Sequence, residues 1–362
     1  MAGPRTVISD LHPSKPVGFS AHVTSVEDRS NALMGPCAVV WIGLASLVAG
    51  CVHPGRADPT PEVRLTPLAD RIRVELGGEL FTEYFHRDVP KPYCHPLLGP
   101  GGTILTRRWP MQEVPGEDRD HPHHRGFWYA HGSVNGIDFW TEGPNRGRIV
   151  QDEILEIHSG RGMGCFRSRN RWLAADGRVV CTDERLLRFQ TAPNGARILD
   201  FEITLLASHG EVTFGDTKEG TLAVRVAESM RVRPNKAHIG QPVGVILTSH
   251  GHRDTGAWGK RAVWCDYSGP VQNRTVGIAI FDHPANPRHP TWWHVRDYGL
   301  FAANPFGRHD FEQLPDPHAG DLRIPAQGRV TFRYRLYLHD GNAMEARVAD
   351  QYAAWIRSHG GS

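Results

Sequence analysis

A short histidine-rich segment carries the side chains best suited to chemistry. It spans residues 120–132 and reads DHPHHRGFWYAHG. On an extended backbone successive side chains point to opposite sides, so His121 and His123 share one side and His124 faces the other. Imidazole is a common metal ligand and carries protons near neutral pH. The segment therefore predicts proton transfer, substrate contact or a divalent metal at His121 and His123, with hydrogen-bonded packing around a cleft as the alternative.

A second cluster of aromatic and polar side chains lies far along the chain. It comprises WCDYSG at 264–269, FDHPANPRHP at 281–290 and WWHVRDYG at 292–299. Aromatic faces pack against the C–H faces of sugars, while Asp, His, Asn and Arg bind hydroxyl groups. The combination favours a carbohydrate site; tryptophans that simply fill a large core are the alternative.

A carboxylate stands between the two clusters. Residues 216–220, DTKEG, precede an expected strand at 221–226. A carboxylate at the mouth of a strand beside a lysine can act as acid or base, whereas a polar turn is the simpler interpretation. We expect Glu219 to transfer protons together with one of His121, His123, His124 and His294. The expected substrate-binding residues are Arg107, Arg125, Trp128, His131, Trp140, Asp266, Trp293, Arg296 and Asn304, with the arginines holding hydroxyls or a carboxylate and the tryptophans forming walls.

The elements that position these residues are strands, because hydrophobic residues alternate with polar ones through most of the chain. Residues 71–76 and 79–85 flank Gly77-Gly78 and predict a hairpin. Residues 199–205, 222–226 and 330–338 alternate in the same way. The one helical pattern is 343–358, with Met344, Val348, Tyr352, Trp355 and Ile356 on one face. The pattern predicts an all-β fold: a large antiparallel β-sandwich with long loops and a C-terminal helix.

The cysteines argue against a disulfide-dependent or thiolate-zinc protein. If Asp176-Gly177 form a hairpin turn, Cys181 lies opposite Trp172 and Cys165 opposite Arg188, so these two cysteines do not meet. The sequence has no CxxC motif.

The N-terminal residues resemble an export signal. The hydrophobic run at 37–49 has the length of a signal core, and the Val48-Ala49-Gly50-Cys51 that completes it resembles the lipobox of bacterial lipoproteins. We expect a leader over 1–50, lipidation at Cys51, a Pro-rich tether over 51–66 and a single domain over 67–362. Residues 1–33 are unusually long for a leader, which makes Met34 an alternative start. The expected location is extracytoplasmic, in the periplasm, at the outer membrane or on the cell surface, with contact to the membrane through lipid alone; a buried segment of a cytosolic protein is the alternative.

Composition excludes several classes of protein. The 362 residues are 40% hydrophobic and 22% charged, with a formal net charge of +2. Such a chain is neither disordered, collagenous nor a polytopic membrane protein. A near-neutral charge gives no field for nucleic acid, and no Gly-rich nicotinamide fingerprint is present.

Four segments carry a resemblance to a known family. They are HPLLGPGG at 95–102, DHPHHRGFWYAHG at 120–132, KEG at 218–220 and FDHPANPRHPTWWHVRDYGLFAANPFG at 281–307. Over residues 70–355 the chain resembles the bacterial PmoA-like family, labelled "methane oxygenase PmoA" and otherwise of unknown function. The label does not fit as a function, since that membrane subunit has many helices and this chain has strands. By fold analogy the chain is similar to galactose-mutarotase-like sandwiches, in which a histidine and a glutamate on the concave sheet exchange protons with a sugar. The analogy implies Glu219 with His123, His124 or His294.

Three functions stay open at this point. The first is a lipid-anchored enzyme, a hydrolase, lyase or epimerase that uses His/Glu acid–base chemistry on carbohydrate and needs no cofactor. The second is a non-catalytic glycan-binding lipoprotein. The third is a metal enzyme with a divalent ion at His121 and His123.

Overall fold

The computed structural model divides the chain into two units, residues 1–56 and 57–362, and the described residues, 60–359, all belong to the second. The expected leader and the expected lipidation site at Cys51 lie outside the described residues. No helix among the described residues is both long and apolar enough to cross a membrane.

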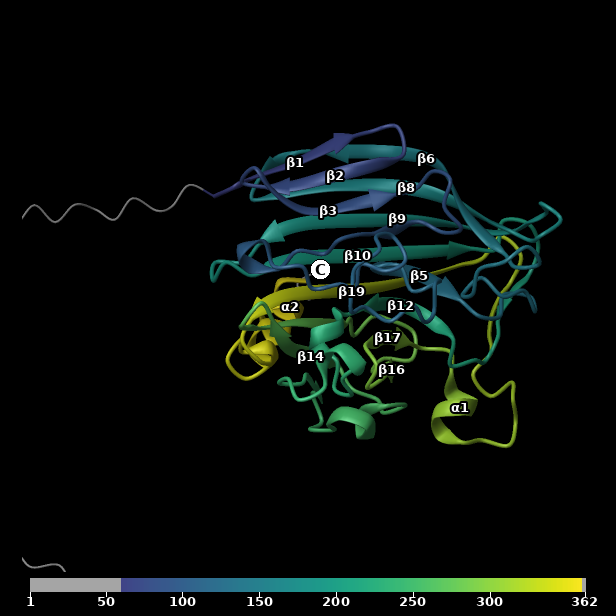
Figure 1. Ribbon diagram of the computed structural model, residues 1–362. Coiled ribbons are helices and arrows are strands. Elements are labelled where there is room, and N and C mark those ends of the chain that lie inside the picture. Colours follow the sequence, from purple (N-terminus) through teal and green to yellow (C-terminus); the bar gives the residue numbers. More distant parts are fainter. Residues whose placement is uncertain (1–59, 360–362) are drawn as a thin grey trace, which may run out of the picture. The chain divides into compact units, whose positions relative to one another are not determined.

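Two antiparallel sheets form the body of residues 60–359 (Figure 1). In spatial order the nine-stranded sheet consists of β16 (Trp292–Val295), β17 (Leu300–Asn304), β12 (Gly220–Arg225), β5 (Phe127–His131), β4 (Tyr93–Cys94), β3 (Glu79–Phe85), β2 (Arg71–Leu76), β1 (Glu62–Pro67) and β7 (Gly160–Arg161). The eight-stranded sheet consists of β13 (Val245–Thr248), β14 (Trp264–Val271), β15 (Arg274–Asp282), β19 (Arg329–Asp340), β10 (Arg197–Leu206), β9 (Val179–Thr191), β8 (Met163–Leu173) and β6 (Arg148–His158).

Smaller elements complete the described fold. Strands β11 (Val212–Phe214) and β18 (Leu322–Ile324) form a separate pair. The helices are α1 (Arg308–Glu312) and α2 (Val348–His359), and the short 3₁₀ turns are η1 (Pro100–Gly102), η2 (Glu228–Met230), η3 (Lys236–His238) and η4 (Asp254–Ala257). The predicted antiparallel sandwich with a C-terminal helix is therefore confirmed.

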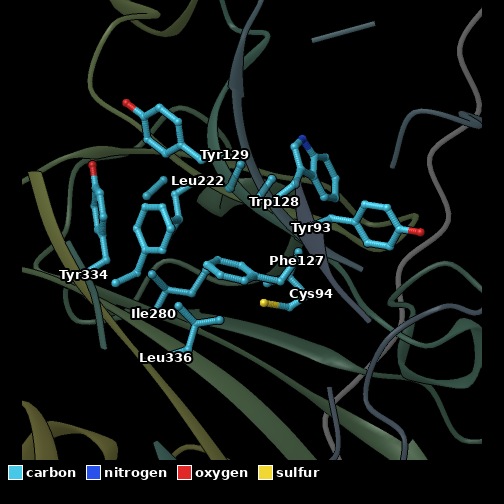
Figure 2. Close-up of a cluster of buried hydrophobic side chains, with 14 of the residues drawn as sticks. Tyr93, Cys94, Phe127, Trp128, Tyr129, Leu222, Ile280, Tyr334 and Leu336 are labelled. Atoms are coloured by element: carbon cyan, nitrogen blue, oxygen red, sulfur yellow. The ribbon is translucent and has the colours of Figure 1, made fainter. Parts of the chain in front are cut away.

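The core lies between the two sheets because alternate residues of each strand point inward. Figure 2 shows Phe127 and Leu222 of the nine-stranded sheet beside Ile280 and Leu336 of the eight-stranded sheet, and all four are buried. The outward positions of β5 and β12 are consequently free to carry polar side chains.

The predicted hairpins have the expected register. Strands β2 and β3 pair around Gly77-Gly78. In the β8–β9 hairpin Cys165 pairs with Arg188 and Trp172 with Cys181, and both cysteines are free thiols. The turn residues Asp176-Gly177 were sufficient to predict this register, because the two strands of a hairpin are adjacent in sequence.

Two predicted boundaries were wrong. Strand β1 begins within the stretch expected to be a tether, since Val63 and Leu65 alternate inward and are buried. The C-terminal helix begins at Val348, not near 343, and Met344 is 76% exposed. Asn342 instead accepts hydrogen bonds from the backbone N–H groups of Met344 and Glu345, which holds this segment as a turn. The helix packs Val348 and Trp355 against the outside of the eight-stranded sheet.

Candidate functional site

One row of outward-facing positions crosses four strands at the end of the nine-stranded sheet. His294 on β16 pairs with Ala302 on β17. Ala302 also pairs with Ala223 on β12, which pairs in turn with Trp128 on β5. Adjacent strands lie about 4.8 Å apart, so about 14 Å separates the backbones at the two ends of the row. Two alanines therefore stand between a histidine and a tryptophan on the face turned away from the eight-stranded sheet, which we call the outer face.

The histidine-rich loop packs on the outer face, and a stack of four aromatic rings forms the contact. The centroids of Tyr298 and His121 are 5.2 Å apart, those of His121 and His124 4.7 Å, and those of His124 and Trp128 5.2 Å. The interplanar angles are 6°, 9° and 21°. This ring stack joins the first sequence cluster to the second, because Tyr298 belongs to the connection between β16 and β17.

The histidines do not have the extended arrangement expected from the sequence. His121 has a φ of 45°, and the backbone N–H of His124 donates to its carbonyl at 3.0 Å. The segment is a turn, so His124 stacks on His121, and His123 packs edge-on against both rings. The prediction that His124 faces away from His121 was therefore wrong.

Arg225 fixes the proton position on His124. The Arg225 side chain is fully buried; one guanidinium nitrogen donates to His124 Nδ1 at 3.2 Å and another to Asp120 at 2.9 and 3.1 Å. Arginine only donates, so His124 Nδ1 is an acceptor and the ring proton resides on Nε2. Burial, together with the charge of Arg225, lowers the pKa of His124 well below its usual range, so the ring stays neutral at neutral pH.

His294 has the same tautomer through a different donor. Trp258 Nε1–H donates to His294 Nδ1 at 3.0 Å. Indole nitrogen is a donor only, so His294 also carries its proton on Nε2. Burial lowers the pKa of His294 to about 3. Both rings are therefore neutral Nε2–H donors, and no hydrogen bond from either Nε2 to another described residue is present.

Glu219 lies at the start of β12, where three contacts of the backbone hold it. Asn304 Nδ2 donates to the carbonyls of Thr217 and Lys218 at 2.9 and 3.0 Å, and Gly132 N–H donates to the Glu219 carbonyl at 2.7 Å. The Glu219 carboxylate is 38% exposed and forms an ion pair with Lys218 at 3.3 Å. Asn304 is thus a positioning residue for the segment that presents this carboxylate.

The charges of Glu219 and Lys218 act on Tyr298 of the ring stack and on His294, respectively. Burial raises the pKa of Tyr298, and the charges of Glu219 and Asp120 act in the same direction against Arg225 and Arg296. After burial and Arg296, the charge of Lys218 also lowers the pKa of His294. Of the histidines expected to transfer protons, His294 thus responds to the charge of Lys218, His121 stacks on Tyr298, and His124 and His123 pack beside His121.

Two of the three arginines expected to bind substrate are engaged within the protein. Arg107 is buried and donates to Asp120 and to the carbonyls of Trp109, Asp118 and His121, so it holds the loop in place. Arg125 donates to both carboxylate oxygens of Glu142 at 2.9 to 3.2 Å. Arg296 has no such partner among the described residues.

The predicted aromatic walls are packing groups. Trp128, Trp140 and Trp293 are at most 1% exposed, so none of them forms an open wall; Trp128 and Trp140 pack beside His124, whereas Trp293 alternates with the outward His294 and faces the core. His131 points inward between Phe214 and Phe306 and hydrogen-bonds the Gly215 carbonyl. Asp266 lies on the other sheet and contacts His339 Nε2 at 2.7 Å. The structure does not bring Asp266 to the outer face.

The donor set does not make a metal site. Within residues 60–359 no group of three or more His, Cys, Asp or Glu side chains is arranged to hold a metal ion. His121 Nδ1 already contacts Asp120, 2.9 Å away, and His123 does not form a three-ligand group with these two residues.

Two buried indole N–H groups beside His124 lack a hydrogen-bond partner among the described residues. They belong to Trp128 and Trp140.

Three residues of the site were not expected from the sequence: Arg225, Tyr298 and Trp258. Arg225 alternates with the inward Leu222 and Val224, so strand periodicity did place it on the outer face. Its contact with His124 joins residues 101 positions apart, which no local pattern reveals.

The tautomers are directly measurable. We expect ¹⁵N–¹H correlation spectra of the histidine side chains to show His124 and His294 as neutral Nε2–H rings at pH 7. Trp258→Phe removes the donor to His294 Nδ1 and is expected to leave that ring with mixed tautomers, while His124 keeps its signal pattern. A wild-type spectrum with His294 protonated on Nδ1 would contradict this geometry.

Comparisons with known proteins give a family but no activity. A model described as "Family of unknown function (DUF6807)" matches residues 71–354. No protein with a curated description matches the chain. The match agrees with the prediction of a family without established function, and the label PmoA-like stays a prediction.

Matches to solved structures are distant. A GalM/aldose epimerase homologue from C. elegans is 8% identical, with 77% of this chain and 99% of that chain covered and a TM-score of 0.28. The 4-alpha-glucanotransferase from Thermococcus litoralis is 9% identical, with 77% and 39% covered and a TM-score of 0.22, so the match spans about two fifths of that enzyme. TM-scores this low establish neither fold nor function, and the mutarotase-like analogy stays a prediction.

Proposed function

The chain belongs to DUF6807, a family of unknown function, and from the site itself we propose that it is a carbohydrate-active enzyme that works by acid–base chemistry on the outer face. The observation that carries the proposal is the pair of neutral histidines on the outer face, whose tautomers Arg225 and Trp258 fix. His124 and His294 are 1% and 3% exposed and each has Nδ1 occupied by a donor, so Nε2–H is the group of each ring that remains to donate to a ligand oxygen.

The chemistry divides between the carboxylate and the two rings. Glu219 is the base that removes a proton from a hydroxyl or from a carbon next to a carbonyl. A neutral Nε2–H donates a hydrogen bond to the oxygen on which negative charge develops, and the proton taken up by Glu219 returns from its carboxyl group to the sugar or to its leaving group. Because Arg225 and Trp258 fix both tautomers before substrate arrives, these donors are preorganised.

The arrangement favours epimerisation or elimination over hydrolysis. Glycoside hydrolysis typically uses two carboxyl groups on either side of the bond. Here Asp120 is bound by Arg107, Arg225 and His121, which leaves Glu219 as the carboxylate of the site without an arginine partner. Proton transfer by one carboxylate with neutral donors suits a step that begins by deprotonating the sugar.

The lipid anchor and the location are separate parts of the proposal. We propose that Cys51 is lipidated and that the domain works outside the cytoplasm of a bacterium, as the lipobox-like sequence indicates. The partners are then a carbohydrate substrate and, through the lipid, a membrane.

The test is turnover in D₂O with ¹H NMR detection on a panel of mono- and oligosaccharides, their 3-keto derivatives and uronic acids. Epimerisation at carbon is expected to exchange a sugar C–H for deuterium, and elimination is expected to remove a C–H signal and produce the vinylic signal of an unsaturated sugar. Hydrolysis yields new reducing ends with neither change. Sugar binding without any turnover would favour the glycan-binding alternative. Absence of both binding and turnover on the whole panel would overturn the proposal.

A further inference from the structure

Arg296 is a cation without a matching anion inside the site. Its guanidinium carbon lies 5.7 Å from the ring centroids of both Trp258 and Tyr298. No carboxylate of the described residues forms an ion pair with it, and its side chain makes no hydrogen bond to them. The side chain is half-buried, so its charge is held between two aromatic faces and still meets solvent.

The neighbouring cations are different, because each already has an anion. Arg225 is paired with Asp120, Lys218 with Glu219, and Arg233 with Asp297 at 3.4 Å. Arg296 is thus a positive charge without an anionic partner among the described residues. It lies between Trp258, which donates to His294, and Tyr298, which is the first ring of the stack.

The backbone around Arg296 is fixed. Its N–H donates to the Leu300 carbonyl at 2.8 Å, and the N–H of Gly299 donates to the Arg296 carbonyl at 3.0 Å. The charge of Arg296 also acts on the buried His294 ring. The guanidinium therefore packs on the same Trp258 ring that donates to His294.

We infer that Arg296 binds a carboxylate of the substrate and that the substrate class is an acidic sugar, a uronic acid or an oligosaccharide that contains one. The inference rests on the proposed function and names its substrate. The planar fork of a guanidinium matches a carboxylate with two parallel hydrogen bonds, and flanking aromatic faces orient that plane. A carboxylate also lowers the pKa of the adjacent C–H, which is the bond that Glu219 has to break in an epimerisation or elimination at that carbon.

The experiment uses matched pairs of sugars that differ only in charge. Tetrasaccharides of galacturonate, glucuronate and mannuronate are each compared with the same oligomer after reduction of its carboxyl groups to neutral hydroxymethyl groups. Isothermal titration with the full-length protein measures Kd for each pair. We expect at least one uronate to bind about tenfold or more tightly than its neutral partner.

Three variants assign the preference to Arg296. Arg296→Gln is expected to bring the ratio of the two Kd values close to one by weakening binding of the uronate alone. Arg296→Lys, which keeps the charge but not the fork, is expected to retain part of the ratio. Arg233→Gln is the matched control, since it removes a nearby positive charge that already has a partner, and it is expected to leave the ratio unchanged.

The outcomes separate this inference from the proposed function. Equal binding of a uronate and its neutral partner, or a preference that survives Arg296→Gln, overturns the acidic-sugar inference and leaves a neutral-sugar enzyme standing. Failure of every charged and neutral sugar to bind or react overturns both. If Arg296→Gln does not fold, the Arg296→Lys ratio decides, and a ratio identical to that of wild type contradicts the role of the guanidinium fork.

Discussion

Glu219→Gln is expected to lower kcat by about 10²- to 10⁴-fold on whichever sugar the enzyme turns over, because the amide cannot accept the proton. The substitution keeps the size and hydrogen-bonding shape of the side chain. Its backbone contacts to Gly132 and the hold of Asn304 on residues 217 and 218 do not involve the carboxylate. Binding of the sugar is therefore expected to change far less than turnover, so the loss appears in kcat and not in KM.

The matched control is Glu153→Gln, which removes a 58% exposed carboxylate from β6, on the other sheet. Its kcat and KM are expected to equal those of wild type. A Glu219→Gln protein that retains more than about a tenth of wild-type kcat would remove Glu219 from the role of base.

Acid is expected to begin to destabilise the domain above the pH range in which an ordinary carboxylate titrates. Burial lowers the pKa of His95 and His131 to about 4 and that of His294 to about 3. The unfolded chain therefore takes up protons as the pH falls below about 6.5, while these three folded side chains stay neutral. The stability they contribute is fully present above pH 6.5 and is lost progressively down to pH 4.

The expected loss is large. These three protons alone correspond to about 4 kcal/mol for each pH unit, or on the order of 10 kcal/mol between pH 6.5 and pH 4, and the lowered pKa values of His123 and His124 add to the loss. That is comparable to the whole stability of a typical domain. Carboxylates have a smaller net influence, because the pKa values of Asp120 and Glu142 are lowered while those of Asp216 and Glu228 are raised.

Urea unfolding at pH 7.5, 6.5, 5.5 and 4.5 measures this dependence. His131→Gln, which keeps a donor for the Gly215 carbonyl, is expected to reduce the slope by the share of one proton, about 1.4 kcal/mol per pH unit. His158→Gln, at a 67% exposed position, is the control and is expected to leave the slope unchanged. A free energy of unfolding that is constant from pH 7.5 to 4.5 would contradict the burial of these neutral rings.

The fold was largely predictable because alternation of hydrophobic and polar residues and local turn residues determine most of the strands of the sandwich. Alternation gave the inward faces of β10, β12 and β19, and the Asp176-Gly177 turn gave the pairing of Cys181 with Trp172. Boundaries were less predictable at 62–67 and at 343–347, where a strand and a turn replaced an expected tether and an expected helical turn.

The sequence was sufficient to identify the segments that form the candidate site, but not the role of each side chain in it. Composition marked Glu219, the loop at 120–132 and the segment at 292–299, and the ring stack joins this loop to this segment. It could not show that Arg107 and Arg125 are bound to carboxylates, or that Trp128 and Trp140 are covered. These roles depend on contacts between residues remote in sequence, such as the hydrogen bond from Arg225 that fixes the tautomer of His124.

The most direct test is a crystal structure of the Glu219→Gln protein with a sugar identified as a substrate. We expect the sugar to lie on the outer face, with the side chain of residue 219 and Nε2 of His124 or His294 within about 2.6–3.2 Å of its oxygens. The same sugar bound elsewhere, for instance in the cavity lined by Arg108, Glu117 and His238, with residue 219 and both Nε2 atoms free of it, would contradict the proposed site.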